Sequence, residues 1–134
     1  MPYLQLDVCG HYPADTKRTL AGRLAETYAE TMAMDIRRIS IAIRELGEAG
    51  LWRIVDGEPV PAHVLMCDIR RGRDAELRLR LAQQLVAICA ATLGIDEHRL
   101  NVEFTQHAGD EMYHPMLGGF SPEWADSSEQ DAPG

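Results

Sequence analysis

Long apolar runs are missing from this sequence of 134 residues. No stretch approaches the roughly 18 consecutive apolar residues of a membrane-spanning helix. The N-terminus has neither the basic region nor the apolar segment of a secretory signal peptide. We therefore expect a cytoplasmic protein that has no membrane partner.

Basic residues are also scarce, with 13 lysines and arginines against 21 aspartates and glutamates. The formal net charge of −8 and the isoelectric point near 5.0 argue against a nucleic acid or an anionic membrane as the main partner. Against this background, any cluster of arginines stands out. With 46% hydrophobic residues, the chain fits one globular domain with its own core.

Cysteine is rare, and no two cysteines have the spacing of a disulfide-rich or zinc-binding framework. Cys9, Cys67 and Cys89 lie in stretches with strand or helix periodicity, so we expect three buried thiols. The histidines and acids of residues 107–114 match no zinc-binding spacing either. We therefore expect no metal and no cofactor.

What the sequence does contain is an internal repeat. A shift of 61 residues, without a gap, superposes identical residues of the two halves. The matched pairs are Leu4 and Leu65, Asp7 and Asp68, Ala14 and Ala75, Leu20 and Leu81, Ala21 and Ala82, Leu24 and Leu85, Ala29 and Ala90, Thr31 and Thr92, Asp35 and Asp96, and Arg38 and Arg99. We predict a single domain, 1–134, made of two repeats, 2–45 and 63–106.

Each repeat changes its periodicity from strand to helix and back to strand. Residues 2–9 alternate, residues 14–33 place apolar side chains at helical spacing, and residues 39–43 alternate again. The second repeat has strand patterns at 63–69 and 100–104. The core-facing stripe predicted for its helix consists of Leu77, Leu81, Leu85, Ile88 and Thr92.

A strand, helix, strand unit gives two parallel strands joined by a right-handed crossover. Two such units can join edge to edge into one sheet that has both helices on one face. We therefore predict an α+β fold, a tandem β-α-β repeat that forms a four-stranded mixed sheet. The opposite face of the sheet is then left for other subunits to cover.

The connector at 46–62 is rich in turn residues but too apolar for a free linker, and it predicts a loop with a short hairpin or a helical turn. The tail at 121–134 contains acidic residues but no lysine or arginine, so we expect it to be solvated or disordered. Trp124 is the residue of this tail that could dock on the domain.

Proline at position 2 gives the first repeat a chemical group that the second lacks. A small second residue generally allows removal of the initiator methionine, so we expect the mature chain to begin with Pro2. α-Amino groups titrate near about 7.7 to 8.0, so a terminal prolyl amine can act as a general base at neutral pH. The alternative is an inert, disordered terminus. His63 takes the place of Pro2 in the second repeat but has no free amine, and we expect an ordinary, partly exposed histidine.

A basic cluster follows the first strand of the second repeat. Arg70, Arg71 and Arg73 lie together in an acidic chain, and arginine offers a planar fork that matches a carboxylate. The cluster therefore predicts binding of a small acid. The alternative is a loop of solvated arginines that pair with neighbouring carboxylates.

With these residues, the chain resembles the tautomerase superfamily over roughly residues 2–115. Residues 68–73 and 96–104 resemble cis-3-chloroacrylic acid dehalogenase, whereas residues 39–43 and Trp52 resemble the 4-oxalocrotonate tautomerases. The resemblance implies a fused pair of 4-oxalocrotonate tautomerase units with the tautomerase/MIF-like fold, a homotrimer and no cofactor. It also implies that a prolyl nitrogen moves a proton while arginines hold the substrate carboxylate.

By this resemblance, Pro2 is the catalytic acid/base, and Arg70 and Arg73 bind the carboxylate of a small-molecule substrate. Trp52 either walls the pocket, as an aromatic residue does in the family, or caps the core. Only the first repeat can present a prolyl amine, so one site per chain is expected.

Several positions depart from the family patterns. His114 stands where the dehalogenase has its water-activating glutamate, Glu103 where it has a tyrosine, and Tyr28 where it has a histidine. All three are expected to line the substrate site. Ser40 and Asn101 replace the arginine that 4-oxalocrotonate tautomerases carry in their second strand. The loss of that arginine argues against efficient turnover of a dicarboxylic enol. Hydration needs a base that activates water, whereas keto-enol transfer does not, so the departures at His114, Glu103 and Tyr28 favour tautomerisation.

The sequence thus predicts an isomerase, a proline-dependent keto-enol tautomerase of a small 2-oxo or 2-hydroxyalkenoic acid. The first alternative is a hydratase, dehalogenase or decarboxylase of a three-carbon acid, in which Glu103, Glu111 or His114 activates water. The second alternative is a trimeric binding protein without catalytic activity.

Overall fold

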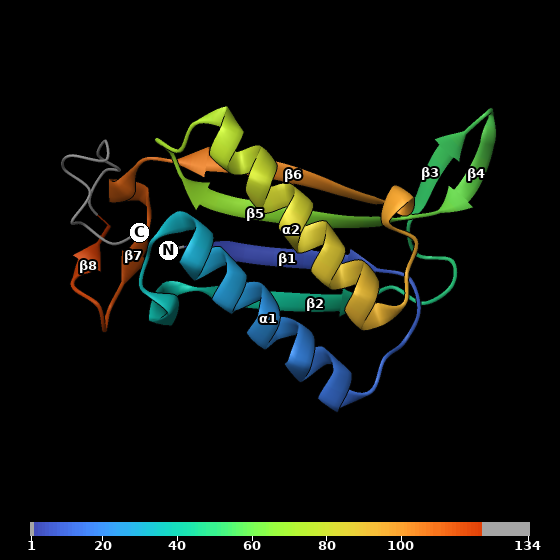
Figure 1. The fold of residues 1–134 in the computed structure, drawn as a ribbon, viewed down its shortest axis with the longest axis horizontal. Helices are drawn as coiled ribbons and strands as arrows, with labels where there is room; N and C mark the ends of the chain where they lie inside the picture. Colours follow the sequence, from blue (N-terminus) through green and yellow to red (C-terminus); the bar gives the residue numbers. More distant parts are fainter. Residues whose placement is uncertain (1, 122–134) are drawn as a thin grey trace.

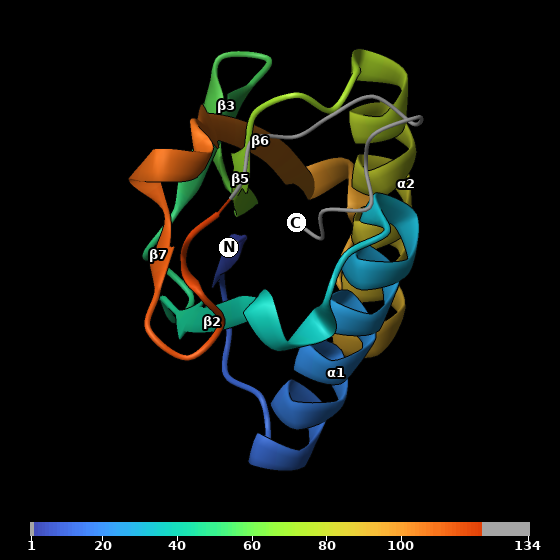
Figure 2. The same ribbon diagram turned by 90° about the vertical axis from the view of Figure 1, so that its left-hand side faces the viewer.

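Two strand, helix, strand units form the body of the computed structural model, which describes residues 2–121. The first unit consists of β1 (Tyr3–Val8), α1 (Ala14–Met32) and β2 (Ser40–Glu45), and the second of β5 (His63–Arg70), α2 (Ala75–Leu93) and β6 (Leu100–His107). The strands of each unit are parallel, while β1 and β5 pair antiparallel in the middle of the sheet, whose order is β2-β1-β5-β6. Both helices cover the same face (Figures 1 and 2). The predicted α+β fold with a mixed four-stranded sheet is confirmed.

Shorter elements connect and extend these units. The turns η1 (Ile36–Arg38) and η2 (Glu97–Arg99) follow the two helices, and η3 (Gly109–Glu111) follows β6. The hairpins are β3 (Trp52–Val55) with β4 (Glu58–Pro61), and β7 (Tyr113–His114) with β8 (Gly119–Phe120). The sequence allowed a short hairpin or a helical turn in the connector, and the structure has the hairpin. The predictions for Met1 and for residues 122–134, Trp124 included, lie outside the described residues.

Apolar side chains fill the layer between the sheet and the helices. The fully buried ones include Leu4, Leu6 and Val8 of β1, Leu65, Cys67 and Ile69 of β5, Leu20, Leu24, Tyr28 and Met32 of α1, and Leu81, Leu85 and Cys89 of α2. The prediction for α2 placed Ile88 and Thr92 in the buried stripe, but the structure buries Cys89 with Leu81 and Leu85. Cys89 is the counterpart of the buried Tyr28 under the 61-residue shift. All three cysteines are buried and free, as predicted.

The face of the sheet away from the helices carries polar side chains of β1 and β2 beside Val64 and Met66 of β5. Tyr3, Gln5 and Asp7 alternate with the core residues of β1, and the Tyr3 hydroxyl donates to Gln5 Oε1 at 3.0 Å. Arg44 of β2 donates to both carboxylate oxygens of Asp7, at 2.5 and 2.9 Å. Polar side chains on this face therefore satisfy one another across neighbouring strands.

Exposed apolar side chains gather instead on the two hairpins. Trp52 and Ile54 of the β3–β4 hairpin are more than half exposed, as are Tyr113, Met116 and Phe120 of the β7–β8 hairpin and its loop. The two hairpins lie at opposite ends of the sheet (Figure 1). Within residues 2–121, no helix is both long and apolar enough to cross a membrane.

Candidate active site

Segments that are far apart in the sequence meet at the end of the sheet where β1 begins, which we call the proline end (Figures 1 and 2). They are the start of β1, the C-terminal end of α1, η1, the loop after β5, the end of β6 and the β7–β8 hairpin. Pro2 is buried there, and its carbonyl accepts a hydrogen bond from the Ser40 N–H at 3.1 Å. Pro2 is therefore held against β2 and is not part of a loose terminus.

The predicted arginines lie at the end of β5, whose last residue is Arg70, and in the loop that follows, which bends at Gly72. The φ of Gly72 is 116°, a conformation that favours glycine. Arg70 and Arg73 are only 3% and 4% exposed, whereas Arg71 is exposed. The Arg71 N–H donates to the His107 carbonyl at 2.7 Å, which holds the loop against the end of β6. Arg70 and Arg73 are therefore not solvated, as the loop alternative requires, whereas Arg71 is.

Arg73 lies at the C-terminal end of α1. Its Nη2 donates to the Met32 carbonyl at 3.2 Å, where unpaired carbonyls and the helix dipole favour a cation. Burial lowers the pKa of Arg73 to about 10, with Tyr28 opposing the shift and Arg70 adding to it. The guanidinium thus stays charged at neutral pH, and because it is shielded from water it attracts a carboxylate more strongly than a surface arginine does.

Tyr28 belongs to the buried stripe of α1 and is close enough to Arg73 and Arg70 for their charges to act on its phenol. Burial raises the pKa of Tyr28 well above the usual 10.0, and the two arginines reduce this effect. The phenol is therefore protonated at physiological pH and can donate a hydrogen bond, but it cannot serve as a base. The chain brings Tyr28 together with both buried arginines.

His114 comes to the proline end in the β7–β8 hairpin (Figure 2). Its Nδ1 accepts a hydrogen bond from the Met116 N–H at 3.1 Å, so this nitrogen serves the hairpin. Glu111, the acid proposed as an alternative, accepts from the Ala108 N–H at 2.8 Å and caps η3. Both side chains are thus engaged in local turns.

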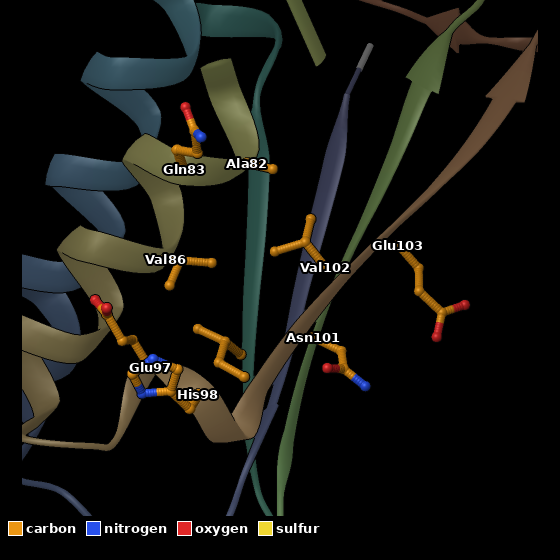
Figure 3. A pocket seen from close by; sticks show the side chains of 9 residues that line it. Ala82, Gln83, Val86, Glu97, His98, Asn101, Val102 and Glu103 are labelled. Carbon is orange, nitrogen blue, oxygen red and sulfur yellow. The ribbon is translucent and has the colours of Figure 1, made fainter. Parts of the chain in front are cut away.

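Glu103 lies in the middle of the edge strand β6, away from the proline end. It pairs in register with Met66, which pairs with Gln5 of β1. Glu103 therefore stands three residues along the sheet from Pro2, or about 10 Å, and two strands across. With Val86, Val102 and other residues, it lines an open groove of about 610 Å³ between α2 and β6 (Figure 3).

This groove does not have the chemistry of an acid-binding site. Its polar lining includes Glu97 and Glu103 together with His98 and amide side chains, and no arginine or lysine is among its lining residues. A carboxylate would meet like charge there. We therefore place the candidate site at the proline end.

Trp52 is also remote from Pro2 within this chain. It is 51% exposed in the β3–β4 hairpin, at the other end of the sheet, and its Nε1 donates to the Ala49 carbonyl at 3.1 Å. With Ile54 and Pro59 it forms an apolar surface. This exposure is inconsistent with the core-capping alternative, and the pocket-wall alternative requires a second copy of the chain.

The prediction of a partly exposed His63 is wrong, because the residue is only 7% exposed. Its Nδ1 accepts a hydrogen bond from the Cys9 N–H at 3.1 Å. Burial, together with the nearby charge of Arg99, lowers the pKa of His63 and favours the neutral ring. The second repeat thus uses the position equivalent to Pro2 for an internal hydrogen bond. Sequence reasoning missed this because the partner, Cys9, belongs to the other repeat.

Sequence reasoning also missed two features of the proline end. Arg38 donates from Nη2 to the Leu117 carbonyl at 2.9 Å and so ties the β7–β8 hairpin to the start of β2. His107 Nε2 lies 2.6 Å from Asp68 Oδ1. The 61-residue shift pairs Arg38 with Arg99, which marked Arg38 as a repeated residue. No sequence pattern, however, linked Arg38 to Leu117. In the part of the chain that is described, no group of three or more His, Cys, Asp or Glu side chains could hold a metal ion.

No protein-family profile and no curated protein matches the sequence. Solved structures do match the fold. A fused 4-oxalocrotonate tautomerase, Q0, described as a symmetric trimer, has a TM-score of 0.76 at 21% identity, covering 89% of this chain and 94% of its own. Pt0534, inactivated by 2-oxo-3-pentynoate, has a TM-score of 0.74 at 21% identity with the same two coverages.

A third structure, N1 of the cis-3-chloroacrylic acid dehalogenase family, has a TM-score of 0.78 at 18% identity, covering 90% of this chain and 84% of its own. At these identities the likeness establishes the fold. The chain therefore has the fold of the fused 4-oxalocrotonate tautomerases and of the cis-3-chloroacrylic acid dehalogenase family, as the resemblance of its sequence to the tautomerase superfamily predicts.

Proposed function

We propose that this protein is an isomerase, a keto-enol tautomerase that acts on a small 2-oxo or 2-hydroxyalkenoic acid through the amine of Pro2. The observation that carries the proposal is the meeting of a buried proline at position 2 with two buried arginines, Arg70 and Arg73, at one end of the sheet. An acidic chain that buries cations beside a potential amine base is suited to a small anion.

In the proposed reaction, Arg70 and Arg73 bind the carboxylate and Tyr28 supplies a hydrogen-bond donor. The neutral prolyl nitrogen takes the hydroxyl proton of the enol and returns a proton to the carbon of the enol double bond, so the carbonyl forms with no net gain or loss of protons. The nearby positive charges favour the neutral form of the amine before the reaction. The amine must be terminal, which requires removal of Met1.

The contacts of the predicted water-activating residues support tautomerisation over hydration, dehalogenation or decarboxylation. His114 accepts a hydrogen bond within its hairpin through Nδ1, and Glu111 caps η3. Keto-enol transfer needs none of them, because a single group can both remove and return the proton.

We further propose that the protein acts as a homotrimer. The Q0 protein of the same fold is described as a trimer, and the exposed apolar hairpins of this chain supply surface that assembly would bury. In such an assembly, Trp52 and Glu103 of one copy would line the site of another.

The experiment begins with mass spectrometry of the mature protein, because retained Met1 rules out the prolyl amine. Ketonisation of phenylenolpyruvate and 2-hydroxymuconate is then measured for the wild type, Pro2→Ala, Arg73→Gln and Arg71→Gln. Pro2→Ala is expected to lower kcat about 10² to 10⁴-fold, the usual contribution of a positioned acid/base. Arg73→Gln should raise KM strongly, whereas the exposed Arg71→Gln is the matched control and should change little.

Undiminished activity of Pro2→Ala would remove Pro2 from the mechanism. Turnover of 3-haloacrylates or propiolate in preference to the enols would favour the hydratase or dehalogenase alternative. An absence of turnover on every acid would favour a binding protein.

A further inference from the structure

Asp68 and His107 form a close pair at the proline end that the proposed reaction does not use. His107 Nε2 lies 2.6 Å from Asp68 Oδ1, and the same oxygen accepts a hydrogen bond from the Thr105 hydroxyl. At this distance the imidazole must carry a proton on Nε2, because two lone pairs would repel each other. The contact therefore fixes both the tautomer and the orientation of the ring.

The register of the last two strands brings this pair beside a carboxylate-binding arginine. His107 is the partner of Arg70 in the β5–β6 ladder, and Asp68 is the partner of Thr105. Side chains two residues apart in a strand lie on the same face, so Asp68, Arg70 and His107 share the face away from the helices. On its other side, Asp68 pairs with the start of β1.

His107 also holds the arginine loop through its backbone. It is the last residue of β6, an edge strand of the sheet, and its carbonyl accepts the Arg71 N–H at 2.7 Å. This bond comes one residue before the bend at Gly72, where φ is 116°. The end of an edge strand frays readily, because it has a neighbouring strand on one side only. An imidazole tied to Asp68 of β5 opposes this fraying and keeps the acceptor in place for Arg71.

The first repeat shows how the same aspartate is used without a histidine. Under the 61-residue shift, Asp68, Thr105 and His107 correspond to Asp7, Arg44 and Leu46. Both carboxylate oxygens of Asp7 are occupied by Arg44 of the facing strand. The loop that follows β1, residues 9–13, contains no arginine. The histidine thus occurs in the repeat whose first strand leads into the arginine loop.

We propose that Asp68 and His107 are positioning residues of the candidate active site. Asp68 locks the ring of His107, and His107 holds the loop that aims Arg70 and Arg73 at the substrate carboxylate. The inference rests on the proposed function for the role of the two arginines. Neither residue of the pair takes part in the proton transfer, so the pair acts on the affinity for the acid and not on kcat.

The test measures KM and kcat for phenylenolpyruvate together with calorimetric binding of crotonate, an acid that has no enol to ketonise. His107→Leu removes the ring and leaves an apolar side chain, as at the equivalent position of the first repeat. It should raise KM and the Kd of crotonate about tenfold, the scale of one charge-assisted contact, with kcat within about twofold of the wild type. His107→Gln can still place a donor near the position of Nε2 and should retain most of the wild-type affinity.

Asp68→Ala separates positioning from a simple effect of charge. Loss of a negative charge beside Arg70 would by itself tighten the binding of an anion, whereas loss of positioning weakens it. The double variant Asp68→Ala, His107→Leu should bind no more weakly than the weaker single variant, because each change removes the same contact. His98→Leu is the matched control and should change neither constant, since His98 Nδ1 lies 3.2 Å from Asp96 Oδ1 in an exposed pair before the start of β6.

If His107→Leu does not fold, His107→Asn decides, because asparagine is too short to reach Asp68 from the position of Nε2 and the same loss is expected. Unchanged affinity in these variants, tighter binding in Asp68→Ala, or a fall in kcat at constant KM would overturn the proposal. Arg73→Gln distinguishes the two proposals. If it leaves crotonate binding unchanged, the proposed function fails, whereas weaker binding in Arg73→Gln but not in His107→Leu rejects the positioning pair alone.

Discussion

At the scale of single residues, the two repeats form the same helix end with different amino acids. Ala33 caps the C-terminus of α1 with φ 51° and ψ 60°, and Gly94 caps that of α2 with φ 69° and ψ 33°. Both backbones are left-handed, which glycine adopts without the steric clash that a Cβ introduces. Ala33 is exposed, and a Cβ at Gly94 would meet no atom within 4 Å. The difference between the two ends is therefore one of backbone strain alone.

Ala33→Gly is accordingly expected to raise the free energy of unfolding by about 1 kcal/mol, and Gly94→Ala to lower it by about the same amount. Urea unfolding of the two variants measures these changes. The double variant Ala33→Gly, Gly94→Ala should have nearly the wild-type free energy of unfolding, because the two sites lie at different helix ends and their opposite effects add. A destabilised Ala33→Gly would show that the strain at Ala33 is relieved elsewhere.

At the scale of elements, one buried hydrogen bond joins the end of β1 to the start of β5. The Cys9 N–H donates to His63 Nδ1, which can accept only when it carries no proton. Burial, and secondarily Arg99, lower the pKa of His63 below its usual 6.5. As the pH falls through about 6.5, His63 is protonated in the unfolded chain before it is protonated in the folded chain. The contribution of His63 to the free energy of unfolding is therefore lost as the pH falls.

We expect the free energy of unfolding to be highest above about pH 7.5 and to fall below pH 6.5, with a slope of at most about 1.4 kcal/mol per pH unit from His63. His63→Asn keeps an acceptor near Nδ1 but does not titrate, so its stability should vary less between pH 5 and 7. Urea midpoints across this range provide the measurement. His98→Asn, at a histidine that is 85% exposed, is the control and should keep the wild-type slope, and an equal flattening in it would refute the assignment.

At the scale of the whole molecule, the hairpins offer exposed apolar surface for assembly in addition to the open face of the sheet. The open face is mixed: Arg44 pairs with Asp7 on it, and Val64 and Met66 of β5 lie beside them. Trp52 and Ile54 present an apolar surface on the β3–β4 hairpin. Burial of such side chains between copies is worth about 1.5 to 3 kcal/mol each.

The double variant Trp52→Ser, Ile54→Ser should therefore shift the proposed trimer toward monomers at micromolar concentration, as measured by light scattering. The expected activity loss follows, since Trp52 lines a site only across copies in the proposed assembly. Leu79→Ser is a control at an exposed apolar position, 58% accessible, on the outer helix layer. An unchanged trimer in the hairpin variant would place the interface elsewhere.

Local patterns allowed much of this structure to be predicted. The 61-residue shift pairs Asp35 with Asp96, and both carboxylates cap the turns that follow the helices, by accepting from the N–H groups of Arg37 and His98. Such interactions span two residues and depend on the local sequence alone. The helices, the strands and the arginine loop were predictable for the same reason, because periodicity and turn chemistry are local properties.

Tertiary structure decided which distant residues meet. Strand order places β1 beside β5, so Pro2 and the arginine loop share one end of the sheet, while Glu103 and Trp52 lie away from it in the same chain. The burial of His63 against Cys9 and the contact of Arg38 with Leu117 arise in the same way. Sequence by itself determined the repeated unit and its chemical groups. Long-range register, which no local pattern encodes, determined which of those groups can act together.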